Sequence, residues 1–213
     1  MTPSDRGGLA RASESPTGHA AAKAALRELA SHRRAARRRP PGADAARLHQ
    51  ALAACAGHAA VACYASIGDE PTTWALIEAL RAGGVRVLLP VLAGRRTPAW
   101  AWHTGPEALR RGFLGIPEPT GPALGPDALR ETSFVWASAL LAAPDGVRLG
   151  TGGGWYDRAL TYTAPAARVG VLLDDDDEVV DALPCDPWDR RVDCLVTPSR
   201  TLPTGAAQHG SVE

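Results

Sequence analysis

Apolar segments of strand length alternate with helix-forming segments along most of this chain, and this alternation constrains the fold more than any other feature. "AAVACYA" (59–65) is followed by "PTTWALIEALRAGG" (71–84), which has the character of a helix, and then by the apolar run "VRVLLP" (85–90). This order predicts a β-α-β unit. Because such a crossover joins parallel strands, the remaining strands are expected to extend a mostly parallel sheet.

The other segments fit the same pattern. Helices are predicted at 20–39, 44–56 and near 155–163, and strands at 99–103, 133–141, 168–173 and 192–198. We therefore expect an α/β three-layer sandwich with a mostly parallel central sheet and helices on both faces. The 213 residues fit one domain, placed at 19–200, between a disordered N-terminal tail (1–18) and a flexible C-terminal tail (201–213).

Charge and hydropathy exclude several classes of partner. The chain has 23 basic and 23 acidic residues, so nothing in its overall charge favours a nucleic acid or an anionic membrane, and any anion site must be local. It has no apolar run near the roughly 20 residues of a membrane span and no signal-peptide core. We expect a cytoplasmic monomer without nucleic-acid or membrane partners. The four cysteines form no C-x-x-C pair and are interpreted as buried, reduced thiols.

The stretch "GTGGGWYD" (150–157) is the strongest local motif. Its glycine spacing matches neither the Walker pattern nor the dinucleotide fingerprint. Glycines nevertheless allow backbone N–H groups to converge on anionic oxygens, and a following helix would add the positive end of its dipole. A phosphate cradle and a plain flexible turn both remain open.

Three charged groups each allow more than one interpretation. Lys23, the only lysine, and Arg27 lie four residues apart on one helix face, which suits either a polyphosphate or a solvated surface. The arginines within 33–39 either face water or contact nucleic acid, and water is favoured. The acidic run 174–178 is interpreted as a solvated loop, and none of the six histidines is assigned chemistry.

Six segments in a fixed order carry a resemblance to a known family. They are "KAALR" (23–27), "YASIGDEPTTWALIEAL" (64–80), "VLLPVL" (87–92), "GIPEPTG" (115–121), "RLGTGGGWYD" (148–157) and "DPWDRRVDCLVTP" (186–198). Together they resemble the 5-formyltetrahydrofolate cyclo-ligase family, also called methenyltetrahydrofolate synthetases. The resemblance implies an α/β fold and ATP-dependent conversion of 5-formyltetrahydrofolate to 5,10-methenyltetrahydrofolate, with Mg²⁺ as cofactor and release of ADP and phosphate.

The resemblance also implies a role for individual residues. It assigns two carboxylates, Asp157 and Asp189, to Mg²⁺, while Ala65 and Glu70, with Trp155 and Tyr156, would contact the reduced folate. It leaves the catalytic side chain unassigned. The residues that it assigns to ATP are Lys23, Arg27, Arg148, Gly150, Thr151, Gly152, Gly153, Gly154, Trp155 and Tyr156.

Structural interpretations of the same residues stay open. Glu70 and Asp157 suit the first turn of a helix, Asp189 suits a surface pair with Arg190 or Arg191, and the two aromatic residues suit the core.

The chain also departs from the family pattern close to the expected site. Thr151 replaces a basic or aromatic residue, Ala143 an aspartate and Trp188 a histidine, and a proline is expected near Ser138. These departures allow a second hypothesis, a catalytically weakened member that serves as a nucleotide- or folate-binding protein.

Overall fold

A computed structural model describes residues 16–92 and 97–208, and its centre is a seven-stranded sheet with the order β11-β10-β9-β6-β1-β2-β3. Neighbouring strands from β10 to β2 run parallel, whereas β11 and β3 pair antiparallel at the two edges. The strands are β1 (Ala60–Ala62), β2 (Arg86–Pro90), β3 (Trp100–His103), β6 (Phe134–Ala137), β9 (Arg168–Leu172), β10 (Cys194–Val196) and β11 (Thr201–Pro203). The prediction of a mostly parallel sheet is confirmed.

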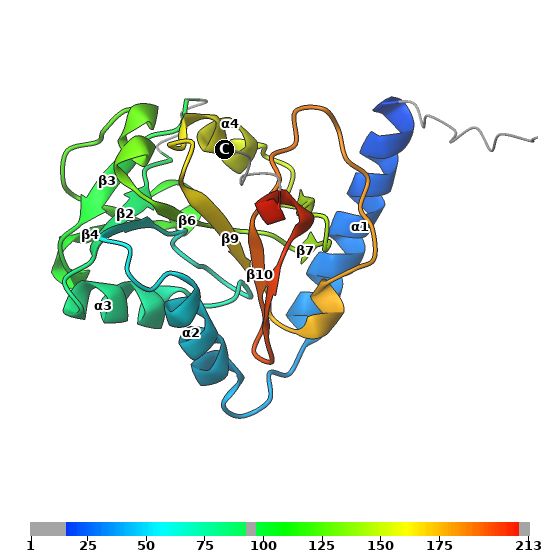
Figure 1. Cartoon of the computed structure of the whole chain (residues 1–213), viewed down its shortest axis with the longest axis horizontal. Coiled ribbons are helices and arrows are strands. Elements are labelled where there is room, and N and C mark those ends of the chain that lie inside the picture. Colours follow the sequence, from blue (N-terminus) through cyan, green and yellow to red (C-terminus); the bar gives the residue numbers. More distant parts are fainter. Residues whose placement is uncertain (1–15, 93–96, 209–213) are drawn as a thin grey trace, which may run out of the picture.

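Helices cover the sheet on both sides. Figure 1 shows α2 and α3 on one side and α4 on the other, with α1 standing beside the β10 end of the sheet. The α-helices are α1 (Pro16–Ala36), α2 (Ala43–Ala54), α3 (Trp74–Ala82) and α4 (Trp155–Ala159). The 3₁₀ helices are η1 (Pro106–Ala108), η2 (Phe113–Gly115), η3 (Pro126–Glu131), η4 (Leu160–Tyr162), η5 (Asp176–Glu178) and η6 (Gly205–Gln208). Two small sheets pair β4 (Leu109–Arg111) with β5 (Pro117–Pro119) and β7 (Leu141–Ala142) with β8 (Arg148–Leu149).

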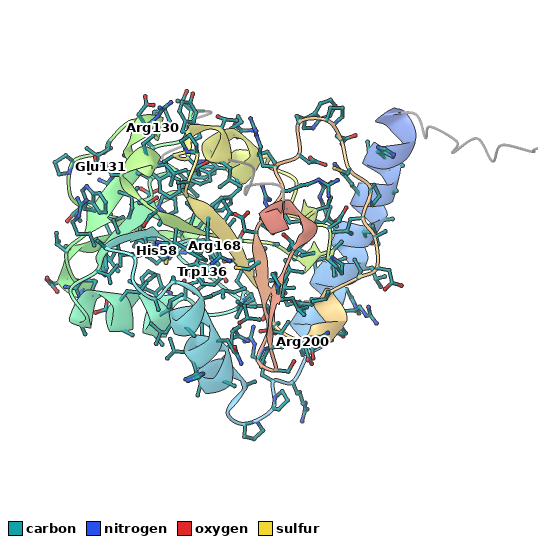
Figure 2. The ribbon with its side chains drawn as sticks, viewed as in Figure 1. His58, Arg130, Glu131, Trp136, Arg168 and Arg200 are labelled. Carbon is teal, nitrogen blue, oxygen red and sulfur yellow. The ribbon has the colours of Figure 1, made fainter. Side chains whose placement is uncertain are left out.

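The alternation of side chains along β6 explains the layers. Phe134 and Trp136 point into the core cluster on the α2–α3 side, and Val135 and Ala137 into the cluster on the α4 side. Successive strand residues face opposite sides of a sheet, so a strand covered on both faces must be apolar throughout. All four residues are 0% exposed, and Figure 2 shows Trp136 inside the molecule.

Three boundaries differ from the sequence prediction. The segment 133–141 is not one strand, because it leaves the main sheet after Ala137 and continues as β7 in a separate hairpin. The start of the C-terminal tail at residue 201 is wrong, because Thr201–Pro203 forms β11 against β10. α1 begins at Pro16, within the tail predicted for residues 1–18, and the rest of that tail lies outside the described residues.

The basic and acidic runs pair with each other, which corrects their interpretation as solvated segments. Arg34 is buried and donates to both carboxylate oxygens of Glu178, at 2.9 and 2.6 Å, and Arg39 donates to both oxygens of Asp174, at 2.7 and 2.9 Å. Arg37 pairs with Asp177 at 2.5 Å.

These pairs fasten α1 to the segment after β9, and Figure 1 shows the chain between η5 and β10 running along α1. Arg200, labelled in Figure 2, adds a pair with Asp176 at 3.3 Å.

The cysteines are free thiols, and most of them are buried in the core. Cys55, Cys63 and Cys194 are buried free thiols, as expected, whereas Cys185 is only partly buried. Burial raises the pKa of Cys194 to about 12, which keeps this thiol protonated.

Among residues 16–92 and 97–208, no helix is long and apolar enough to cross a membrane.

Candidate active site

The site lies at the switch point of the sheet, where strands that follow β1 in the sequence lie on both sides of it. From β1 the chain adds β2 on one side, and later β6 on the other, so the loops after β1 and β6 diverge at their carboxyl ends. Such switch points are the usual ligand sites of parallel α/β sheets. Here the loops border a cleft of about 1090 Å³, lined by Ala65 and Glu70 after β1, Pro90 after β2 and Ser138 after β6.

Every residue that the sequence assigned to a ligand lines this one cleft. The set combines α1, the loop after β1, the glycine loop and the segment before β10. Its members are Lys23, Arg27, Ala65, Glu70, Arg148, Gly150, Thr151, Gly152, Gly153, Gly154, Trp155, Tyr156, Asp157 and Asp189. The resemblance therefore selected residues that folding brings together, although their location alone does not assign their roles.

The glycine loop is held at its start by α1. Arg27 Nε donates to the carbonyl oxygen of Gly150 at 3.0 Å. Gly152 and Gly154 have φ values of +104° and +61°, a region that residues with a Cβ rarely adopt, so the glycines are required for this path. The helix that follows, α4, has only five residues, so it contributes a weaker dipole than the sequence analysis assumed.

Lys23 is buried between two carboxylates. Its Nζ lies 2.6 Å from Asp186 Oδ2 and 2.5 Å from Asp189 Oδ2, and the N–H of Asp186 donates to the same Asp189 oxygen at 2.8 Å. Burial acts to lower the pKa of Lys23, but the hydrogen bonds to the carboxylates outweigh burial and raise it. The ammonium is thus charged and fixed at the cleft wall, and the solvated interpretation of Lys23 is wrong.

Asp186 was missed by the sequence analysis. Its partners are Lys23 and also His19, whose Nδ1 lies 3.3 Å from Asp186 Oδ1. The hydrogen bond from Lys23 lowers the pKa of Asp186. The available signal was the first aspartate of "DPWD", three residues before Asp189.

Asp157 faces a second buried cation. Arg148 Nη2 donates to Asp157 Oδ1 at 2.7 Å, and the backbone N–H of Arg190 donates to the same oxygen at 3.3 Å. Burial lowers the pKa of Arg148, and the attraction of Asp157 opposes this shift. Asp157 and Asp189 therefore line one cleft as expected, but each already has a cationic partner, and the predicted surface pair of Asp189 with Arg190 or Arg191 is replaced by Lys23.

Three residues that line the cleft carry buried donors without protein partners. Within residues 16–92 and 97–208, Arg148 Nε, Trp155 Nε1 and the Tyr156 hydroxyl are buried and have no hydrogen-bond partner. Trp155 stacks edge-on against Trp100 at 5.0 Å, so the aromatic pair also belongs to the core. The three donor atoms have almost no exposed area, so they belong to the packed interior and do not by themselves indicate a ligand in the cleft.

Glu70 closes its own loop. Its Oε2 accepts a hydrogen bond from the Ile67 N–H at 2.9 Å, and burial raises the pKa of the carboxyl group. The residue precedes α3, which begins at Trp74 after Thr73, so Glu70 lies outside the first helical turn. The interpretation of Glu70 as a partner of the helix dipole is therefore wrong.

The mouth of the cleft is apolar, and sequence reasoning missed most of it. Phe113, Leu114 and Trp188 line it with exposed fractions of 50%, 74% and 65%. Leu114 has a φ of +55°, unusual for a residue with a branched side chain. An exposed apolar rim of this kind suits a ligand with an aromatic body.

The departures from the family pattern divide into two groups. Thr151, Trp188 and Ser138 line the cleft, as expected. Ala143 does not; it is 0% exposed in the turn between β7 and β8, where its N–H donates to Val147. Of these departures, Ala143 is therefore the one whose side chain does not line the cleft.

Curated proteins of known name resemble this chain in sequence. The 5-formyltetrahydrofolate cyclo-ligase of Mycolicibacterium smegmatis is 35% identical over 146 residues, which cover 67% of this chain and 75% of the relative. The 5-formyltetrahydrofolate cyclo-ligase of Escherichia coli K12 is 32% identical over 143 residues, covering 66% and 78%.

Solved structures share the fold. The 5,10-methenyltetrahydrofolate synthetase of Aquifex aeolicus superposes with a TM-score of 0.71 at 24% identity, covering 85% of this chain and 92% of the other. The synthetase of Mycoplasma pneumoniae gives 0.64 at 18% identity, covering 83% and 98%. The model of the 5-formyltetrahydrofolate cyclo-ligase family matches residues 19–198, and the chain therefore belongs to that family.

Proposed function

We propose that this enzyme converts 5-formyltetrahydrofolate to 5,10-methenyltetrahydrofolate with consumption of ATP and release of ADP and phosphate. Membership of the family makes it a ligase that forms a carbon–nitrogen bond. The observation that supports the proposal is that the candidate ligand residues of α1, the loop after β1, the glycine loop and the segment before β10 line one and the same cleft. Nothing in the fold favours the alternative of a binding protein without catalysis.

The chemistry requires activation of a formyl amide, whose oxygen is a poor leaving group. Transfer of the γ-phosphoryl group to that oxygen releases ADP, N10 then attacks the activated carbon and loses its proton, and phosphate departs with the former formyl oxygen. Phosphoryl transfer of this kind needs positioning and cations more than covalent participation by the protein. Lys23 and Arg148 supply the cations, and the backbone of 150–154 supplies N–H groups for the phosphates.

The donor set also fits Mg²⁺. Among the residues that the structure describes, no group of three or more His, Cys, Asp or Glu side chains is placed to hold a metal ion. Mg²⁺ at phosphate sites, however, is held by one or two carboxylates together with substrate phosphates and water. Asp157 and Asp189 are those carboxylates in our proposal, and the bound ion would neutralise charge on the phosphates.

The substrate end lies at Glu70 and the aromatic residues. Glu70 presents a carboxylate that can accept hydrogen bonds from the donor edge of a pterin, and Tyr156 lines the same cleft. The apolar rim of Phe113, Leu114 and Trp188 excludes water from the aromatic part of the folate. That the enzyme acts as a cytoplasmic monomer stays a prediction.

The test is an ultraviolet assay for the methenyl product with 5-formyltetrahydrofolate, ATP and Mg²⁺. We expect product formation that requires ATP, in a one-to-one ratio with released phosphate. A purified, folded protein that binds both ligands but forms no product would contradict the proposed activity and favour the binding-protein alternative.

A further inference from the structure

Arg39 connects the end of α1 to the loop that carries Glu70. It lies just after α1, which ends at Ala36, and its Nε donates to both oxygens of Asp174, at 2.7 and 2.9 Å. Its Nη2 donates to the carbonyl oxygens of Asp69 at 2.7 Å and of Glu70 at 3.3 Å. One guanidinium therefore binds a carboxylate with one edge and two loop carbonyls with the other.

The carboxylate that holds Arg39 is itself fixed. The Asp174 side chain is 0% exposed and follows β9 directly in the central sheet. Arg47 Nη1 donates to Asp174 at 3.3 Å, and the Asp174 N–H donates to Glu178 at 2.7 Å. Arg39 is thus attached to a buried carboxylate that has further hydrogen-bond partners beside the central sheet.

The loop has little other support at its tip. Its base is closed by hydrogen bonds between Ser66 and Thr73, but residues 67–69 are exposed. A second cavity, of about 150 Å³, borders the loop at Asp69 and Glu70. The flanking carbonyls accept from other side chains, Ser66 O from Trp74 Nε1 at 3.0 Å and Pro71 O from the Tyr64 hydroxyl at 2.6 Å. Among the described residues, Arg39 is the side chain that donates to the carbonyls of Asp69 and Glu70 between them.

From this geometry we infer that Arg39 is a positioning residue for folate: it holds the Asp69–Glu70 backbone so that the Glu70 carboxylate faces the cleft. The inference rests on the proposed function, because the loop after β1 is assigned to the folate side. Arg39 itself is absent from the residues that line the cleft, so it acts through Glu70.

Calorimetric binding of 5-formyltetrahydrofolate and of ATP, measured separately, tests this role without depending on turnover. Arg39→Lys keeps a charge for Asp174 but lacks the second N–H group that reaches the carbonyls. We expect the Kd for the folate to rise on the order of tenfold in Arg39→Lys and Arg39→Ala, with the Kd for ATP unchanged. Arg37→Ala is the matched control, because Arg37 pairs with Asp175 and Asp177 but not with the loop.

Three results would overturn the inference. Folate binding equal to that of the parent in a folded Arg39→Lys enzyme would remove the positioning role. A parallel loss of ATP and folate affinity would indicate a general effect on the fold, and the same loss in Arg37→Ala would indicate that docking of α1 is what matters. Absence of product from the parent enzyme would instead count against the proposed reaction, while the binding constants would still decide the role of Arg39.

Discussion

At the scale of single residues, the ammonium of Lys23 has two carboxylate partners in the structure, Asp186 and Asp189, where the sequence allowed either a polyphosphate or solvent. An ammonium has three N–H donors, so these two hydrogen bonds leave one donor for a further acceptor. Under the proposed function that acceptor is a phosphate oxygen of ATP. The carboxylates hold the charged ammonium at the cleft wall, so this contact would need little movement of α1.

Lys23→Ala tests this interpretation. We expect the KM for ATP to rise about ten- to a hundredfold, since one charge-assisted contact to phosphate is lost, and the KM for folate to stay within about twofold. Arg33→Ala removes an exposed cation from the same helix and should change neither value. Steady-state kinetics with each substrate varied in turn gives both constants. Equal affinity for ATP in the variant and the parent would exclude the phosphate role of Lys23.

Glu70→Gln separates function from stability. A neutral amide accepts less well from a pterin, so the KM for folate should rise while the KM for ATP does not. Burial raises the pKa of Glu70, so ionisation of this group costs stability in the folded state. The stability that its protonated form contributes is complete below the ordinary value of 4.5 and is lost as pH rises through the raised pKa.

The stability part of this prediction is checked by thermal unfolding across pH. The Tm of Glu70→Gln should exceed that of the parent at pH 8, and the difference should shrink toward pH 4, where the parent carboxyl group is neutral as well. A difference that is constant with pH would show that packing, and not charge, accounts for it. A change in the KM for ATP alone would remove Glu70 from the folate side.

The motif resemblance identified residues that line the cleft, but the sequence predicted few of the contacts that these residues make. It selected Lys23, Glu70 and Asp189, which line one cleft in the structure. It missed Asp186 because nothing local to "DPWD" reveals that a lysine more than 160 positions earlier needs a counter-ion. It misplaced Ala143 because a motif position does not state whether a side chain points into a core or a cleft.

At the scale of elements, α1 is attached to the domain mainly by charge. Its apolar contacts are limited to residues such as Leu26 and Ala30 against the β7–β8 hairpin. Along the rest of the helix and just beyond it, Arg34, Arg37 and Arg39 bind the acidic segment that follows β9. The element that carries Lys23 and Arg27 is therefore positioned in part by ion pairs of arginines that do not line the cleft.

Glu178→Gln should destabilise the protein by about 3 kcal/mol, because it leaves the buried charge of Arg34 without its ionic partner. Asp177→Asn is the matched control: this carboxylate is 51% exposed, and its pair with Arg37 should be worth less than about 1 kcal/mol. Urea unfolding followed by tryptophan fluorescence measures both. Equal losses of unfolding free energy in the two variants would show that burial does not increase the contribution of the Arg34–Glu178 pair to stability.

These pairs also explain why the charged runs were misinterpreted. "RRAARRR" and "DDDDE" lie about 140 residues apart, and each alone has the composition of a solvated segment. The two runs become partners only in the folded chain, where the segment after β9 lies beside α1. The opposite signs of two charge runs in a chain with no net charge were the available signal, but such a signal does not name the partners.

At the scale of the whole molecule, the fold joins Asp157, after the glycine loop, to Asp189, before β10. Both line the same cleft, so the arrangement that would exclude a shared ion, carboxylates on opposite faces, is not present. Oδ1 of Asp157 and Oδ2 of Asp189 accept the hydrogen bonds from Arg148 and Lys23, and the other oxygen of each carboxylate takes no part in these bonds.

Asp157→Asn and Asp189→Asn should each raise the Mg²⁺ concentration needed for half-maximal turnover, by on the order of tenfold, and lower the maximal rate. Each substitution also removes a negative charge beside the phosphate site, so binding of metal-free ATP should stay the same or tighten. Asp127→Asn, at a side chain that is 73% exposed and paired with Arg130, is the control for charge outside the cleft.

The opposite signs of these two effects make the assignment testable. A substitution that merely damaged the fold would weaken metal-free ATP binding and the Mg²⁺ response together. Loss of a metal ligand should shift only the Mg²⁺ titration, measured both by turnover and by calorimetric binding of Mg²⁺ to the enzyme with ADP. If both variants keep the Mg²⁺ requirement of the parent and of Asp127→Asn, the two aspartates serve only as counter-ions of Lys23 and Arg148, and the metal must be held elsewhere.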